Sequence, residues 1–190
     1  MSWFRKTLLV AGLILMIGGM ALLASTRHMS TRGGAEEMWD RISNRIPERS
    51  GGAVGVYSNP EMPAIELDGY DFCGLLELPG YGVRLPVGDD WSCLNVLRWP
   101  CRYGGSAYDG SLILAGADQP EQLEVCKRLE IDDLIYFTDL TGMEFRYRVA
   151  RVDRASQINF DVLTRGDYQL TLYIKDSYSM EYILVRCSQA

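Results

Sequence analysis

Five cysteines are the side chains best suited to attack a substrate, and a cysteine needs a nearby base to become a reactive thiolate. Histidine is the usual base, and the sequence contains a single one, His28. It lies four residues after a long hydrophobic segment, so reaching a groove in a folded domain would require the intervening chain to fold back. The same shortage excludes a Ser–His–Asp triad. We therefore expect neither kind of nucleophilic catalysis in its usual form.

The spacing of the cysteines does not favour a metal site. Their number is odd and no CxxC motif occurs, whereas structural zinc sites commonly pair their ligands at that spacing. We therefore expect no metal and no cofactor. A disulfide between Cys93 and Cys101 is one pairing that the sequence allows. The simpler expectation is that most of the cysteines are small buried hydrophobic residues.

The charge balance argues against nucleic acid as a partner. The chain carries 25 acidic and 19 basic residues, a net charge of −6, and an acidic surface repels a phosphate backbone. The motifs GxSxG, P-loop and GxGxxG are absent from the sequence. Neither an α/β-hydrolase nor a nucleotide-binding function is indicated.

Residues 7–24 (TLLVAGLILMIGGMALLA) form a hydrophobic segment without charge. As a helix it would be about 27 Å long, close to the thickness of a bilayer core. We expect an uncleaved transmembrane anchor here, with residues 1–6 cytoplasmic and the remainder of the chain extracytoplasmic. A signal peptide cleaved after Ala24 is the alternative, although Leu22 is a poor residue at the −3 position of such a site.

Residues 25–61 are expected to be a stalk. Within them, residues 35–46 place Met38, Ile42 and Ile46 on one face, as in an amphipathic helix. Residues 47–68 contain three prolines and little periodicity, which is typical of a linker.

Beyond the linker, the patterns are those of short strands. Apolar and charged residues alternate over residues 143–149, and a turn sequence separates them from the apolar run at 134–138, which predicts a hairpin. One short helix is expected near residues 122–129. The other strands are expected at residues 72–78, 82–87, 111–115, 168–174 and 182–187. This order predicts a mostly-β domain over residues 62–190, built as an antiparallel or mixed barrel of seven or eight strands.

Several short stretches resemble the sortases, membrane-anchored bacterial cysteine transpeptidases that join surface proteins to the cell wall. The stretches are GLLELP at 74–79, LPV at 85–87, PCRYGGSAY at 100–108, LILAGA at 112–117, FTD at 137–139, LTLY at 170–173 and VRC at 185–187. The resemblance covers about two thirds of the chain. It implies an eight-stranded sortase-like β-barrel with one or two short helices, preceded by a single transmembrane helix.

The resemblance also implies where the catalytic residues would stand. The family histidine follows an apolar Ala-Gly stretch, and Ala117 occupies that position here. The family cysteine ends a TLxTC strand, which corresponds to TLYIK and places Lys175 there. The family arginine opens the last strand, where this chain has Tyr182, or Glu181 if the register differs by one. Since all three positions are changed, we expect no catalytic residues.

Three functions remain as alternatives. The first is a catalytically inactive pseudo-sortase on a bacterial membrane that binds a sorting-signal peptide, a surface-protein or pilin subunit, or an active sortase. The second is an enzyme with altered chemistry, which would use Lys175 as a nucleophile if burial kept it uncharged, or a relocated cysteine. The third is a structural envelope domain without a ligand. The candidate groove residues are Asp118, Thr171, Tyr173, Lys175 and Tyr182.

Several other side chains have a structural interpretation beside a chemical one. Cys101, Cys126 and Cys187 read most simply as buried residues without a base nearby. Asp118 and Asp176 would be a carboxylate pair for acid–base chemistry, or ion-pair partners of Lys175.

Overall fold

The computed structural model describes residues 15–16, 18–19, 34–52 and 61–190. The chain divides into two compact units, Met1–Gly34 and Ala35–Ala190. Most of the predicted anchor (residues 7–24), the predicted cytoplasmic end and His28 lie outside the described residues. Among the described residues, no helix is long and apolar enough to cross a membrane.

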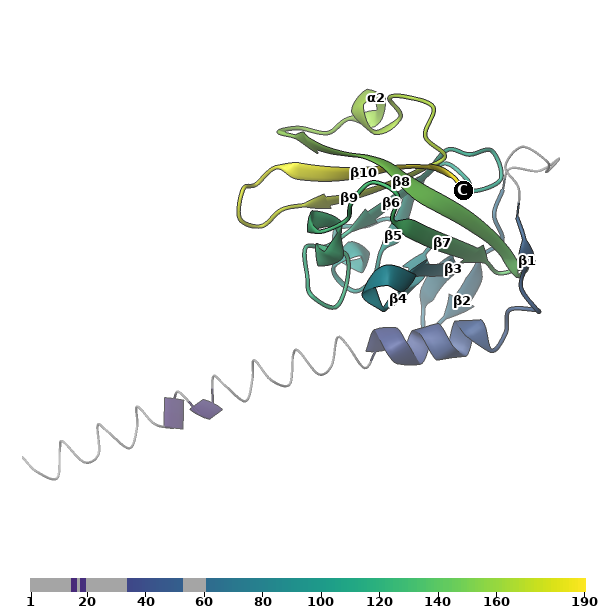
Figure 1. Ribbon diagram of the computed structural model, residues 1–190. Coiled ribbons are helices and arrows are strands. Elements are labelled where there is room, and N and C mark those ends of the chain that lie inside the picture. The colour runs from purple at the N-terminus through teal and green to yellow at the C-terminus, as the bar shows by residue number, and fades with distance from the viewer. Residues whose placement is uncertain (1–14, 17, 20–33, 53–60) are drawn as a thin grey trace, which may run out of the picture. The chain divides into compact units, whose positions relative to one another are not determined.

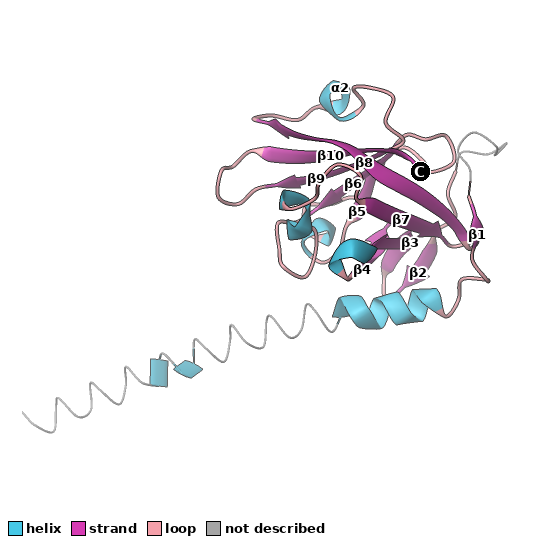
Figure 2. Ribbon diagram, in the orientation of Figure 1, coloured by secondary structure: helices cyan, strands magenta, loops and turns pink. Residues whose placement is uncertain are grey.

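The second unit is a closed β-barrel, as Figure 1 and Figure 2 show. Its strands are β3 (Tyr70–Leu78), β4 (Val83–Gly88), β5 (Cys101–Gly104), β6 (Leu112–Gly116), β7 (Leu134–Asp139), β8 (Met143–Ala155), β9 (Leu170–Lys175) and β10 (Tyr182–Gln189). The order around the barrel is β3-β4-β5-β6-β9-β10-β8-β7, and β7 closes it by pairing with β3. Two of the pairs, β4/β5 and β6/β9, are parallel. The prediction of a mostly-β, eight-stranded barrel is therefore confirmed.

Short elements surround the barrel. They are β1 (Ser50–Gly51), β2 (Ile65–Leu67), the 3-10 helices η1 (Pro79–Tyr81), η2 (Asn95–Leu97) and η3 (Glu124–Lys127), the helix α2 (Phe160–Leu163) and a helix at residues 34–43. The predicted helix near residues 122–129 corresponds to η3. The strands β1 and β2 lie in the segment that was predicted to be linker, because two- and three-residue strands show no periodicity.

Side chains alternate between the interior and the exterior of the barrel, as the period of a β-strand requires. On β9, Leu170, Leu172 and Ile174 belong to the main core, while Thr171 and Tyr173 point to the outer face. β10 alternates in the same way, with Ile183, Val185 and Cys187 inside. The same strands therefore build the core with one set of residues and an exterior surface with the other.

The helix at residues 34–43 packs against the barrel. Its predicted apolar face is present, since Met38 and Ile42 are buried together with Trp39. These side chains form a cluster with β2, β3, the segment before β5 and β5 itself, through Leu67, Phe72, Leu75, Trp99 and Cys101. The helix was assigned to a stalk from the sequence, but its contacts make it part of the compact barrel unit, which begins at Ala35.

The structure corrects the length of one predicted strand, adds a strand that was not predicted, and rules out the suggested disulfide. The hairpin of β7 and β8 is confirmed, but β8 continues to Ala155 because it pairs with β10 along that stretch. The strand β5 was not predicted, since its four residues show no alternation. All five cysteines are free, with Cys93 exposed and Cys101 buried, so the Cys93–Cys101 pairing is wrong. Four of the five are buried, as expected.

Candidate functional site

The strand register brings the three positions singled out by the resemblance together. Gly116 pairs with Ile174, so Ala117 follows beside Lys175, and Lys175 pairs with Tyr182 on β10. We call Ala117, Lys175 and Tyr182 the end row, because they lie where β6 and β9 end and β10 begins. Two further rows cross the same outer face, Ala115–Tyr173–Leu184 and Ile113–Thr171–Arg186.

The end row holds a methyl group, an ammonium group and a phenol. Lys175 is exposed, and its Nζ lies 5.7 Å from the centroid of the half-buried Tyr182 ring, at cation–π distance. The N–H of Ala117 donates to Gln122 Oε1 at 2.5 Å, and the buried Gln122 amide in turn donates to Val96 O at 2.9 Å. No thiol, imidazole or guanidinium belongs to this row.

An ion cluster of Asp118, Lys127 and Asp176 lies next to the end row. Lys127 Nζ is 2.6 Å from Asp118 Oδ1 and 3.0 Å from Asp176 Oδ1. Asp118 Oδ2 also accepts from the N–H of Ser177 at 2.8 Å. The cluster therefore ties the loop after β6 to η3 and to the turn between β9 and β10.

Hydrogen bonds keep both carboxylates of the ion cluster ionised. Burial acts to raise the pKa of Asp118, but the bonds from Lys127 and Ser177 outweigh it and leave this pKa below its ordinary value. The Ser179 hydroxyl, the Tyr178 N–H and Lys127 lower the pKa of Asp176. Because both carboxylates are ionised, the cluster lacks the protonated carboxyl group that would act as the acid of an acid–base pair.

Lys127 is the member of this cluster that the sequence did not reveal. The sequence placed Lys175 beside Asp118 and Asp176, because Lys175 precedes Asp176 directly. Lys175 instead points to the outer face, and Lys127 reaches both carboxylates from η3. The one available signal was a basic residue at the end of a predicted helical stretch.

The middle of the outer face is covered rather than open. Tyr173 and Thr171 are buried. Tyr173 packs in a cluster with Val96 of η2 and with Val162 and Leu163 of α2. The side chain of Asn159 caps α2 by accepting from the N–H of Val162 at 2.8 Å. Of the predicted groove residues, Lys175 and Tyr182 are thus accessible, whereas Tyr173 lies beneath α2 and η2. Thr171 is also buried, at the bottom of a hollow beside Arg186.

A chain of aromatic rings leads from this covered region to the surface. The rings of Tyr173 and Tyr103 are 5.5 Å apart, and Tyr103 stands 5.5 Å from Trp91, both pairs edge to face. Trp91 and Tyr103 remain partly exposed. We call Trp91, Tyr103 and Tyr173 the aromatic chain.

The cysteines of the barrel are poorly suited to nucleophilic attack. Burial raises the pKa of both Cys101 and Cys126 to about 12, and it raises the pKa of Cys187 and Cys73 as well. A thiol with so high a pKa contributes almost no thiolate at neutral pH. Among the described residues, no group of three or more His, Cys, Asp or Glu side chains is arranged to hold a metal ion.

Comparison with known proteins identifies the fold. No protein-family model and no curated protein matches the chain. Among solved structures, it is similar to sortase C from Clostridium perfringens (20% identity, TM-score 0.53, 63% of this chain and 70% of that chain). It is also similar to Listeria monocytogenes sortase A (18%, 0.54, 63% and 87%) and to C. perfringens sortase C with the C-terminal cell wall sorting motif (16%, 0.55, 85% and 86%). The barrel thus has the sortase fold.

Proposed function

We propose that this protein is a membrane-anchored, catalytically inactive sortase-fold protein of the bacterial envelope that binds a sorting-signal peptide. The observation that carries the proposal is the end row. Three adjacent positions, which the resemblance assigns to histidine, cysteine and arginine, hold Ala117, Lys175 and Tyr182. Alanine has no proton to transfer, an exposed lysine is charged at neutral pH, and tyrosine brings no positive charge.

Binding is supported by what remains accessible. The exposed ammonium of Lys175 and the half-buried phenol of Tyr182 present a cation and a hydrogen-bonding ring side by side. One of the solved structures with the same fold contains the C-terminal cell wall sorting motif. A surface-protein or pilin subunit would present the same kind of extended segment to this end of the barrel, and an active sortase is the alternative partner.

A purely structural envelope domain is the second candidate, and one observation favours it. Tyr173, in the row next to the end row, is buried beneath α2 and η2, so no open groove continues from the end row across Tyr173. The third candidate, an enzyme with altered chemistry, has less support. Lys175 is exposed rather than buried, and the barrel cysteines have raised pKa values.

The catalytic part of the proposal is tested by rebuilding the row. The full chain in an uncharged detergent is incubated with an LPxTG-type peptide, and cleavage is followed by mass spectrometry. The wild type should leave the peptide intact. The triple variant Ala117→His, Lys175→Cys, Tyr182→Arg should gain thiol-dependent cleavage, whereas the double variant that keeps Lys175 should not. Thiol-dependent cleavage by the wild type would refute the proposal.

The binding part is tested with the same peptide carrying a fluorescent label. Anisotropy should show saturable binding that Lys175→Glu and Tyr182→Ala each weaken by about tenfold. Arg148→Glu is the matched control, because Arg148 is also an exposed cation but lies on β8 and pairs with Asp132. Absence of binding by the wild type would favour the structural envelope domain.

A further inference from the structure

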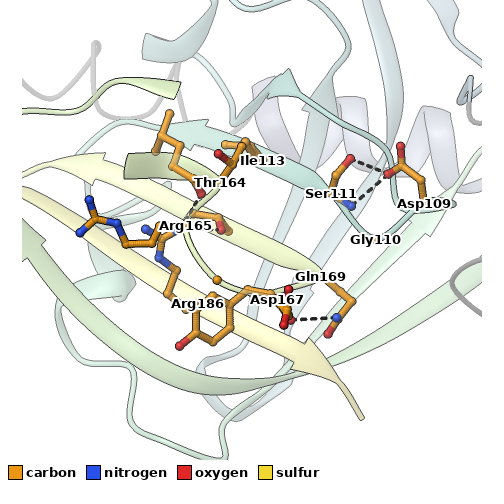
Figure 3. Close-up of a pocket in the computed structure, with 13 residues that line it drawn as sticks. Asp109, Gly110, Ser111, Ile113, Thr164, Arg165, Asp167, Gln169 and Arg186 are labelled. Atoms are coloured by element: carbon orange, nitrogen blue, oxygen red, sulfur yellow. Dashed lines mark hydrogen bonds between the residues drawn. The ribbon is translucent and has the colours of Figure 1, made fainter. Parts of the chain in front are cut away.

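A second feature of the outer face is centred two rows away from the end row, around the buried Arg186 of β10. Two hollows, of about 300 and 400 Å³, flank the segment that follows α2, and both are lined by Arg165, Gly166, Tyr168 and Arg186. Figure 3 shows the first, with Arg165 and Arg186 on one side and Asp109 and Ser111 on the other. The second, which we call the arginine hollow, also extends over the end of β8.

The arginine hollow concentrates positive charge in an acidic protein. Its charged lining consists of four arginines and one carboxylate, Arg151, Arg154, Arg165, Arg186 and Asp153. The chain as a whole has a net charge of −6. Its floor is apolar, formed by Ala155, Val162 and Leu184. A concave surface of this kind focuses a positive potential and attracts anions.

Arg186 is held rigidly, with one donor left over. It is 3% exposed, and its two terminal nitrogens donate to the carbonyls of Val162 and Leu163 at the end of α2, and to Thr171 Oγ1 at 3.2 Å. These bonds explain why an arginine lies here, since they satisfy carbonyls at a helix end. Among the described residues, the Nε–H has no hydrogen-bond partner, and Asp153 Oδ2 is 3.8 Å from Nε. Buried polar groups are rarely left without a partner.

The other arginines of the hollow are also incompletely neutralised. Asp153 is shared, because its Oδ1 accepts from Arg151 Nε at 2.5 Å. Arg154 has only distant partners, Asp176 at 3.8 Å and Glu181 at 4.0 Å. Arg165 is exposed and has no ion pair among the described residues. Burial lowers the pKa of Arg186, and the like charges of Arg151 and Arg165 act in the same direction, against Asp153.

The neighbouring strand edge indicates the form of the ligand. β8 pairs with β10 as far as Ala155, but its pairing with β7 ends at Arg148. Within the described part of the chain, the edge from Ala150 to Ala155 therefore has no strand beside it. A free edge offers backbone donors and acceptors to an extended peptide, and Arg151 and Arg154 on this edge disfavour a basic one.

From this juxtaposition we propose that the arginine hollow binds a carboxylate side chain of an extended acidic peptide segment that lies along the free edge of β8. The carboxylate occupies the hollow between the exposed guanidinium groups of Arg151 and Arg165, where the buried charge of Arg186 also attracts it. The apolar floor accepts an aliphatic neighbour of the acidic residue. The site adjoins the end row, because Ala155 in its lining pairs with Tyr182. Its lining includes none of the three end-row side chains, so the inference stands whether or not the end row binds a peptide.

The test uses the full chain in an uncharged detergent and a labelled, capped peptide of alternating valine and glutamate. Anisotropy should show saturable binding, and the valine–glutamine analogue should not bind. Arg165→Ala and Arg151→Ala should each weaken binding by about tenfold, which is typical of losing one charge-assisted contact. Asp153→Asn should strengthen binding, because it removes the internal carboxylate that competes for the same arginines.

Arg146→Ala is the matched control and should leave binding unchanged. Arg146 also lies on β8, pairs with a carboxylate two residues away, and has the same 65% side-chain exposure as Arg151, but it does not line the hollow. Melting temperatures establish that each variant is folded. An equal loss in Arg146→Ala, or no binding by the wild type, would overturn the proposal. Saturable binding of inorganic phosphate, with the same dependence on Arg165 but no binding of the peptide, would also overturn it.

Discussion

Lys175 and Tyr182 face each other across the β9–β10 ladder, with the lysine Nζ 5.7 Å from the centroid of the tyrosine ring. Lys175 ends β9 and Tyr182 begins β10, on either side of the six-residue stretch 176–181 that reverses the chain. The pair is accessible from outside, whereas the residue two positions earlier on β9, Tyr173, is buried under α2. The exposure of the outward side chains thus changes sharply between Tyr173 and Lys175 on β9, and cysteine labelling can detect this change.

A cysteine introduced at position 175 should react rapidly. In the wild type only Cys93 is exposed, so an alkylating reagent should add one label quickly to the folded protein. Lys175→Cys should add a second fast label, because its side chain lies on the exposed end of β9. Intact-mass spectrometry over time separates the two. Tyr173→Cys provides the contrast, and equally fast labelling there would show that α2 does not cover the outer face.

The glycine before Ala117 should tolerate no side chain. A Cβ at position 116 would lie 2.4 Å from Leu123 Cδ1, so Gly116→Ala must displace η3 or the end of β6. We expect a loss of about 1–3 kcal/mol in the free energy of unfolding, as for other overpacked cores. Gly104→Ala is the control, since a Cβ there meets no atom within 4 Å. Denaturant unfolding of both variants measures the difference, and equal stabilities would contradict it.

The ion cluster should stabilise the fold over a defined pH range. The pKa values of Asp118 and Asp176 lie below the ordinary 3.8, so their contribution is present above that pH and is lost as the pH falls below it. The Lys127 pKa is raised above the ordinary 10.5 by Asp118, so the lysine contribution is lost only as the pH rises beyond that value. Lys127→Met should therefore lower the melting temperature most near neutral pH, and the difference from wild type should shrink below pH about 4.

Arg148→Met is the control for the ion cluster. Its ion pair with Asp132 is exposed on both sides, with N and O 3.6 Å apart, and exposed pairs contribute little. The melting temperature of the Arg148→Met variant should follow that of the wild type across the same pH range. A pH-independent effect of Lys127→Met would show that the side chain acts through packing rather than charge.

The aromatic chain should show measurable coupling. Tyr103 contacts both Trp91 and Tyr173 edge to face. In a double-mutant cycle, Tyr103→Leu and Tyr173→Leu should show a coupling of about 0.5–1.5 kcal/mol, as is usual for such pairs. Tyr103→Leu combined with Tyr136→Leu, on β7, should be additive. If the effects of Tyr103→Leu and Tyr173→Leu on the free energy of unfolding were additive, the two rings would not stabilise each other, and the prediction would be wrong.

The longer strands could be predicted because each shows a clear pattern. Alternation over residues 143–149 and the apolar runs in β6 and β7 correspond to observed strands. The short elements could not be predicted in this way. The four residues of β5 and the three of β2 pair through contacts with distant strands rather than through a local pattern. The length of β8 likewise depends on its partner β10.

The candidate site could be predicted in position but not in environment. Neighbouring positions on β6, β9 and β10 follow from strand register, and the resemblance supplied that register. The partners of each residue depend on side-chain direction and on distant loops. Lys127 reaches Asp118 from η3, and Val162 covers Tyr173 from α2. No local sequence pattern predicts either contact. Arg186 was not singled out, because a single arginine in a strand gives no sign of its burial.

Side chains alternate along β6, β9 and β10, so each strand carries two sets of residues that differ in how freely they can be substituted. The inward residues are constrained by one another's volume, so they can change only together. The outward residues of the end row fill no space in the barrel, so they can be exchanged for other chemistries while the architecture persists. Such a strand can lose an old activity without unfolding, and it can acquire a new one by substitution at every second position alone.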